Sequence, residues 1–172
     1  MTSKPVIRRA SAGDAAALGE LWLQSFKAAL PSVCVVHTDD QVRRWIRDVV
    51  IERQETWVIC VDGEIAGMLA LQGDEIDQLY LAPQRRGQGL GDQLVAQAKS
   101  RRPRGLRLWT FQVNAAAVSF YRRHGFRETT RTDGSQNEEH EPDIRMEWDP
   151  ATPAPQAATG ANAPRRGRPP TS

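Results

Sequence analysis

Two hydrophobic periods alternate along this chain, and together they predict an α/β domain. Apolar residues recur at helical spacing in four segments, at 14–30, 39–50, 90–98 and 115–124. Short runs rich in β-branched and aromatic residues predict seven strands, at 6–10, 56–61, 65–71, 75–81, 106–111, 126–132 and 144–148. The Asp62-Gly63 pair between the second and third runs is typical of a β-hairpin turn. The resulting order, β-α-α-β-β-β-α-β-α-β-β, predicts one domain with a mixed sheet.

Local signals also predict where two of the helices begin or end. Asp39 or Asp40 suits the N-cap of the second helix, because a short acidic side chain can accept a hydrogen bond from the first turn. Gly125 suits the end of the fourth helix, because glycine adopts the left-handed conformation of a C-terminal cap without strain.

Composition changes this picture only at the C-terminal end. Residues 150–172 consist mainly of Ala, Pro, Thr, Gly and Arg and contain no large apolar side chain, so we expect a disordered tail after a domain that spans 1–149. The formal charge of +2 comes from this tail, where Arg165, Arg166 and Arg168 have no acidic neighbour. The domain itself is close to neutral, which does not favour nucleic-acid binding.

The number and spacing of cysteines and histidines, and the absence of a long apolar segment, exclude several classes of protein. Cys34 and Cys60 are the only cysteines, and their spacing predicts neither a disulfide scaffold nor a metal centre. The three histidines are scattered along the chain, so we expect no metal site. No segment approaches the roughly 18 apolar residues of a membrane helix, and residues 1–5 do not resemble a signal peptide. We expect a cytoplasmic protein without membrane attachment.

The segment from Leu81 to Asp92 connects a predicted strand to a predicted helix and carries glycines at alternate positions, Gly87, Gly89 and Gly91. A turn into a helix N-terminus presents unpaired amide hydrogens and the positive end of the helix dipole, and glycine lets the backbone approach an anion closely. These features predict a phosphate-binding turn, with a flexible glycine turn as the alternative. The segment lacks the Gly-Lys-Ser/Thr of a Walker loop, and its place after an antiparallel hairpin excludes the dinucleotide fingerprint.

Two sequence blocks resemble those of the GNAT superfamily of N-acetyltransferases. Arg86-Gly87-Gln88-Gly89-Leu90-Gly91 is similar to the acyl-CoA signature Gln/Arg-x-x-Gly-x-Gly/Ala. Residues 108–126 are similar to the second block, a strand, an Asn and a helix ending in Tyr-x-x-x-Gly-Phe, with Asn114 and Tyr121 at the usual interval. The resemblance covers about residues 5–148. It implies a twisted, mostly antiparallel sheet of about seven strands flanked by about four helices and open between the fourth and fifth strands.

The resemblance implies acetyl-CoA as the co-substrate, with no metal, and it assigns most of the contacts. The pantetheine arm is expected along Leu79, Tyr80 and Leu81. The diphosphate is expected on Arg86, Gly87, Gln88, Gly89, Leu90, Gly91 and Asp92. Asn114 is expected at the coenzyme, and it suits an ordinary helix N-cap as well. Tyr121 is expected to contact the coenzyme and to act as the acid for the departing thiolate, with core packing beside Phe120 and Phe126 as the alternative.

The general base is the catalytic group whose identity the sequence leaves undecided. Strand geometry places Glu75, Asp77, Leu79 and Leu81 on one face of the fourth strand and Ile76, Gln78 and Tyr80 on the other. By resemblance, Glu75 stands where histone-type relatives carry their base, whereas Trp109 occupies the position of a glutamate in other relatives. We predict Asp77 or Glu75 as the base, acting directly or through water. The alternative is that both carboxylates only solvate a strand end.

Five acidic residues within 133–143 favour a cationic acceptor, either a small amine or a peptide amino group, with a solvated loop as the alternative. By resemblance, the loop 31–38 is expected to form the opposite wall. Neither Cys34 nor any serine lies in a nucleophile motif. The sequence therefore predicts an N-acetyltransferase that moves an acetyl group from acetyl-CoA to a primary amine by direct attack, as a monomer or a homodimer.

Two other functions fit parts of the sequence. The first is a non-catalytic acyl-CoA-binding module, against which the intact Tyr121 argues. The second is a DNA-associated protein acetyltransferase, because Arg166-Gly167-Arg168-Pro169 resembles the core of an AT-hook. Chance occurrence in a tail rich in Pro and Arg is the favoured interpretation of that motif, so we do not expect a nucleic-acid partner.

Overall fold

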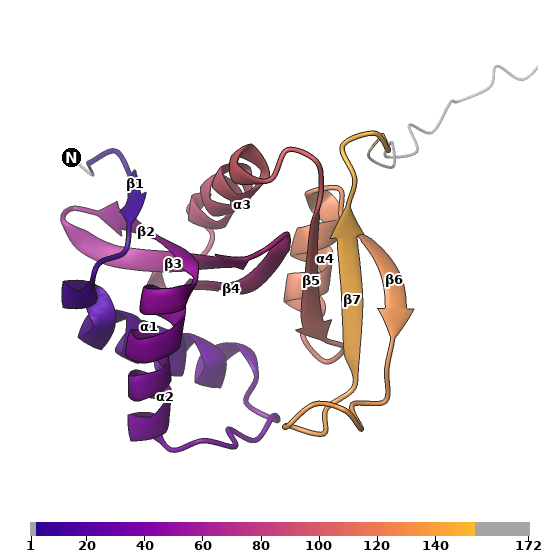
Figure 1. The fold of residues 1–172 in the computed structure, drawn as a ribbon, viewed down its shortest axis with the longest axis horizontal. Coiled ribbons are helices and arrows are strands. Elements are labelled where there is room, and N and C mark those ends of the chain that lie inside the picture. The colour runs from indigo at the N-terminus through magenta and orange to yellow at the C-terminus, as the bar shows by residue number, and fades with distance from the viewer. Residues whose placement is uncertain (1–2, 154–172) are drawn as a thin grey trace, which may run out of the picture.

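The computed structural model describes residues 3–153, which form one sheet with helices on both of its faces (Figure 1). The strands are β1 (Val6–Arg9), β2 (Glu55–Val61), β3 (Glu64–Gln72), β4 (Glu75–Leu81), β5 (Leu106–Phe111), β6 (Arg127–Arg131) and β7 (Asp143–Trp148). The α-helices are α1 (Ala15–Ala29), α2 (Asp39–Trp45), α3 (Leu90–Arg101) and α4 (Ala115–Arg123). This order confirms the predicted succession of elements. Most of the expected tail, including the Arg166–Pro169 motif, lies outside the described residues.

The sheet has the order β1-β2-β3-β4-β5-β7-β6, and it opens in the middle. Every neighbouring pair of strands is antiparallel except β4 and β5, which run parallel and share a single register pair, Glu75 with Arg107. Beyond that pair the two strands diverge, as Figure 1 shows. The predicted mixed sheet, open between its fourth and fifth strands, is therefore confirmed.

Apolar side chains on the two faces of the sheet form separate cores. On one face, α3 and α4 pack buried residues such as Leu94 and Val118 against the sheet. On the other, α1 and α2 contribute Leu18 and Val42 to a second cluster, and Ile46 joins them from the π-helical segment Ile46–Ile51 that continues α2. Each helix therefore buries one apolar stripe, as the helical spacing predicted. Helices thus pack on both faces of the sheet that contains the opening between β4 and β5.

The predicted N-cap of α2 is wrong by one residue. The Oγ1 atom of Thr38 accepts a hydrogen bond from the Gln41 amide at 3.3 Å, and the Gln41 side chain accepts one from the Thr38 amide at 2.8 Å. This reciprocal pair satisfies two backbone donors at once, which a cap at Asp39 or Asp40 does not do. Both aspartates lie in the first turn, where the helix dipole favours negative charge.

A β-bulge at Asp77 overturns the strict alternation predicted for β4. Ala70 of β3 pairs with Gln78, and the next residue of β3, Leu71, pairs with Ile76. Asp77 is therefore an extra residue in β4 that has no pairing partner in β3. As a consequence, Ile76 packs in the same core as Leu79 and Leu81, although the period of two placed it on the opposite face. Tyr80 packs on the α1 side, opposite to Leu79 and Leu81, as the alternation predicted.

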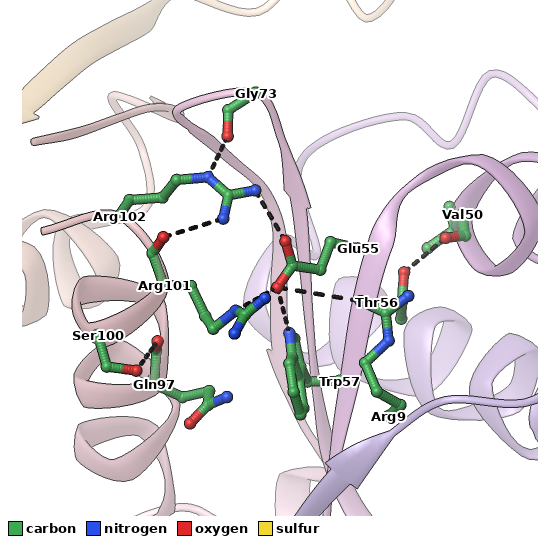
Figure 2. A network of polar contacts seen from close by, with 10 residues as sticks. All are labelled: Arg9, Val50, Glu55, Thr56, Trp57, Gly73, Gln97, Ser100, Arg101 and Arg102. Carbon is green, nitrogen blue, oxygen red and sulfur yellow. Dashed lines mark hydrogen bonds and ion pairs between the residues drawn. The ribbon is translucent and has the colours of Figure 1, made fainter.

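Glu55, the first residue of β2, ties the C-terminal end of α3 to the sheet (Figure 2). Its carboxylate accepts hydrogen bonds from Arg101 Nε at 2.6 Å and Arg102 Nη2 at 2.9 Å, and Trp57 Nε1 donates a third at 3.2 Å. Arg102 also donates through Nε to the carbonyl of Gly73, in the turn between β3 and β4. This network fixes α3, and hence the glycine turn at its start, relative to β4.

We expect Glu55→Gln to lower the free energy of unfolding by about 1–2 kcal/mol at neutral pH, because two guanidinium groups lose their partner. Burial tends to raise the pKa of Glu55, but the hydrogen bonds from Arg102, Arg101 and Trp57 outweigh it and hold the pKa below its ordinary value of 4.5. A carboxyl with a depressed pKa stabilises the fold above its unfolded pKa and loses that contribution as the pH falls through the folded pKa.

Urea denaturation at one pH above 4.5 and one below it measures this effect. The difference in free energy of unfolding between wild type and Glu55→Gln should be smaller at the lower pH. Glu52→Gln removes the same charge from an exposed position nearby and should leave stability unchanged. A difference for Glu55→Gln that does not depend on pH would contradict the role of the carboxylate charge.

Candidate active site

The glycine turn before α3 has the backbone geometry of an anion-binding site. Gly87 and Gly89 adopt φ of 73° and 74°, in the left-handed region that favours glycine, and Gly89 is the N-cap of α3. The first amides of a helix have no intrahelical acceptor, so those of Leu90 and Gly91 stay available for a ligand. At Gly91 a side chain is excluded for another reason, because a Cβ atom would lie 3.1 Å from the ring of Phe120.

This turn borders a cavity of about 580 Å³, here called the glycine-loop cavity. Its walls come from the end of α1, from β4, from the glycine turn and from α4. It brings together ten of the twelve predicted coenzyme residues: Leu79, Tyr80, Leu81, Arg86, Gly87, Gly89, Leu90, Gly91, Asp92 and Asn114. Gln88 and Tyr121 are not among the residues that line it. Phe120 and Arg123 also line it, and the sequence patterns did not single them out.

A second cavity, of about 470 Å³, lies on the β5 side of the opening and is here called the acidic-loop cavity. Its walls come from β5 and from the connection between β6 and β7. The residues that line it are Leu30, Tyr80, Trp109, Thr110, Phe111, Asn114, Thr132, Gln136, Asn137, Glu139 and Asp143. The cavity therefore combines aromatic side chains with two carboxylates.

Tyr80 and Asn114 line both cavities and mark their junction. The Tyr80 ring is held by Trp22, with ring centroids 5.8 Å apart. The Asn114 side chain accepts a hydrogen bond from the Ala117 amide at 3.1 Å, so its predicted N-cap role is confirmed. Two ligands, one in each cavity, would thus meet where β4 and β5 diverge.

Comparisons with known proteins agree with this geometry. A family model described as an acetyltransferase (GNAT) domain matches residues 52–128. The chain is 29% identical over 122 residues to the peptidyl-lysine N-acetyltransferase YiaC of Escherichia coli strain K12, an alignment that covers 70% of this chain and 82% of that protein. The chain contains a GNAT acetyltransferase domain.

Solved GNAT structures share the fold of this domain. The solution structure of the apo form of YjaB from Escherichia coli superposes with a TM-score of 0.72 at 24% identity, over 85% of this chain and 98% of that one. The crystal structure of PaiA N-acetyltransferase from Thermoplasma acidophilum in complex with coenzyme A gives a TM-score of 0.64 at 21% identity, over 86% of this chain and 99% of that one.

Tyr121 of this GNAT domain packs in the core beside Phe120 and Phe126, with ring centroids 5.2 Å and 5.5 Å away. The side chain is 7% exposed, and its hydroxyl makes no hydrogen bond within residues 3–153. Burial raises its pKa, and the proximity of the Tyr80 phenol raises it further. The phenol is therefore neutral at physiological pH and can donate a proton.

The two carboxylates predicted as bases lie on β4 but line neither cavity. Glu75 is at the closed end of the opening, where its Oε2 lies 3.4 Å from Arg107 Nε. Asp77, at the bulge, accepts hydrogen bonds from Gln54 at 2.9 Å and from Gln78 at 3.1 Å. The structure thus gives both groups partners within the protein.

The carboxylates of the acidic loop between β6 and β7 have two different positions: one contacts another loop, and two line the acidic-loop cavity. Glu138 contacts His37 Nε2 at 2.7 Å, which joins this loop to the connection between α1 and α2. Glu139 and Asp143 line the acidic-loop cavity. The charge cluster seen in the sequence could have pointed to them, but nothing in the spacing separates these two from their neighbours.

Asp92 is a carboxylate on the glycine-loop cavity, where it would repel a phosphate if it carried its charge alone. The His124 ring lies 2.8 Å from its Oδ1 atom, and Arg123 Nη2 lies 3.3 Å from it. The hydrogen bond with His124 is the largest cause that lowers the pKa of Asp92, and the bond from Arg123 adds to it. These partners offset the negative charge beside the glycine turn.

Two further observations bear on the site. Residues 3–153 hold no group of three or more His, Cys, Asp or Glu side chains arranged to bind a metal ion. Within the same residues, no helix has the length and apolar character that a membrane crossing requires.

Proposed function

We propose that this GNAT domain transfers the acetyl group of acetyl-CoA to the side-chain amine of lysine in a peptide or protein, by direct attack of the amine on the thioester. The observation that carries the proposal is the meeting of two cavities at Tyr80 and Asn114. One has an anion-binding turn at its wall, and the other has carboxylates.

The glycine-loop cavity suits acetyl-CoA. The turn at Gly87 and Gly89 would hold the diphosphate with backbone amides and the dipole of α3. From Asp77 to Leu81, β4 has no partner in β5, so its backbone can pair with the pantetheine arm. Binding of coenzyme A by the PaiA N-acetyltransferase, which has the same fold, supports this assignment.

The acidic-loop cavity suits a lysine side chain. Glu139 and Asp143 would attract the ammonium, and the apolar faces of Trp109 and Phe111 would contact the methylene groups. Trp109 is 43% exposed as well as lining the cavity, so it leaves apolar surface for residues that flank the lysine. The name of YiaC, a peptidyl-lysine N-acetyltransferase, supports a peptide acceptor over a small amine.

In the proposed reaction the amine attacks the thioester carbonyl near Asn114 and Tyr80. Backbone amides of β4 would stabilise the oxyanion, and the neutral phenol of Tyr121 would protonate the departing thiolate. The proposal needs no covalent intermediate on the enzyme.

Coenzyme A release and mass spectrometry test this function. The substrate is a peptide with one internal lysine and a blocked N-terminus, and the matched control peptide carries arginine in its place. We expect acetylation of the lysine peptide alone, with slower turnover of free small amines. Coenzyme binding by calorimetry without turnover on a panel of lysine peptides would instead indicate a non-catalytic acyl-CoA-binding module.

A further inference from the structure

Glu139 is a carboxylate that faces the junction of the two cavities without a partner of its own. It lines the acidic-loop cavity together with Tyr80 and Asn114, and its side chain is half-buried. Within residues 3–153 it makes no hydrogen bond or ion pair. Burial is the largest cause that raises the pKa of Tyr80, and the charges of Glu139 and Asp77 raise it further, so both carboxylates act on that phenol. Half-buried charges normally have a partner, and a bound cation would supply one here.

The other carboxylate of this cavity is already engaged. Asp143 accepts a hydrogen bond from the Thr132 hydroxyl through one oxygen and from Asn137 Nδ2, at 3.1 Å, through the other. Both oxygens of Asp143 thus have partners within the loop region. On β4, Asp77 is bonded to Gln54 and Gln78, outside the cavity lining.

The loop that carries Glu139 is tightly built. Gly134 is buried at φ 80°, and a Cβ atom there would lie 2.4 Å from the backbone of Glu141. Asn137 Nδ2 donates to the Glu141 carbonyl at 2.8 Å, and Gln112 Nε2 donates to the Asp143 carbonyl at 3.2 Å. Glu139 is therefore held at the junction by a closed loop, which is the arrangement that a catalytic group requires.

We infer that Glu139 is the general base of this GNAT domain, an inference that rests on the proposed function. The acceptor ammonium binds to Glu139 and passes one proton to its carboxylate, which leaves a lone pair on the nitrogen. The nitrogen attacks the thioester carbon, a C–N bond forms, and the C–S bond breaks with departure of the thiolate. The Tyr121 phenol protonates the departing thiolate, the phenolate so formed recovers a proton through solvent as the nitrogen releases its second one, and Glu139 returns its proton to water.

The pH dependence of the variant distinguishes this role from a structural one. Tyr80 and Asp143 line the same cavity as Glu139, and the neighbouring Glu138 contacts His37 from the connection between α1 and α2. Without a base, only lysine that is already neutral can react, so the rate should rise tenfold per pH unit toward the ordinary lysine pKa of about 10.4. With a base, the rate levels off at a lower pH.

Glu139→Gln and Glu139→Asp test the inference on the full chain with acetyl-CoA and the lysine peptide. We expect Glu139→Gln to lower kcat/KM by about 100-fold at neutral pH, with the deficit closing as the pH rises toward 10, and Glu139→Asp to keep part of the activity with the wild-type pH profile. Glu141→Gln removes the same charge from the same loop and should match the wild type, because its side chain makes no hydrogen bond or ion pair within residues 3–153.

The activity of the wild-type protein in the same assay tests the proposed function, which is contradicted only if the wild type does not acetylate lysine peptides. The activity of the variants relative to an active wild type tests the role of Glu139. Unchanged coenzyme affinity and thermal unfolding temperature confirm that the variants fold. Wild-type activity of Glu139→Gln, or a deficit of equal size at every pH, would overturn the role of Glu139 as the base.

Discussion

Gly89→Val should raise the dissociation constant for acetyl-CoA by at least about 100-fold. Gly89 adopts φ 74° at the N-cap of α3, and a β-branched residue in that conformation costs on the order of 1–3 kcal/mol. The chain relieves this strain by rotating the turn, which moves the amides of Leu90 and Gly91 away from the diphosphate. Loss of two hydrogen bonds to a charged group, at about 1.5–3 kcal/mol each, accounts for the effect. Isothermal titration calorimetry with coenzyme A measures it.

Gly63→Val is the matched control for this substitution. Gly63 adopts φ 81° in the turn between β2 and β3, so valine introduces the same kind of backbone strain with open space around it. We expect a similar loss of thermal stability in both variants and a loss of coenzyme binding only in Gly89→Val. Wild-type affinity in folded Gly89→Val would contradict the assignment of the diphosphate to this turn.

Tyr121→Phe should lower kcat by about 100-fold with little change in stability or in coenzyme affinity. The hydroxyl makes no hydrogen bond within the described part of the chain, so its removal leaves no partner unpaired, and phenylalanine keeps the packing against Phe120 and Phe126. The expected loss is that of a positioned proton donor. Steady-state kinetics together with thermal unfolding separate the chemical effect from a structural one.

A comparison of thioesters gives this prediction a second readout. An acyl donor whose thiol is more acidic than that of coenzyme A needs less protonation on departure, so Tyr121→Phe should lose less activity with it. If the variant retains wild-type kcat, or if it loses the same activity with both donors, Tyr121 is a core residue, which was the alternative interpretation of its position.

Local sequence patterns predict most of the secondary-structure elements and two of the turns of this domain. The apolar stripes of 17–26 and 42–50 predict helices because burial of one face at a period of 3.6 residues is a property of the segment itself. The hairpin at Asp62-Gly63 and the phosphate turn at Gly87–Gly91 are equally local, since both depend on backbone conformations that glycine favours. For this reason the order of elements, and most of the residues that line the glycine-loop cavity, could be predicted from the chain alone.

The predictions failed where the answer depends on contacts between distant segments. The extra residue at Asp77 in β4 is set by its pairing with β3, and it moved Ile76 to the other face. The partners of Asp77 and Glu75, Gln54 and Arg107, come from distant segments and are likewise not revealed by the spacing of acids along β4, and the choice of either carboxylate as the base stays a prediction.

The sequence by itself determined the class of fold, the glycine turn and the two blocks that identify a GNAT domain, because periodicity, backbone freedom and helix capping act within a few residues. Only the tertiary structure decided that Glu139, from the loop between β6 and β7, lines the same cavity as Tyr80 of β4. The closed loop around Gly134 and the divergence of the two strands create that proximity, and neither is a property of a short segment.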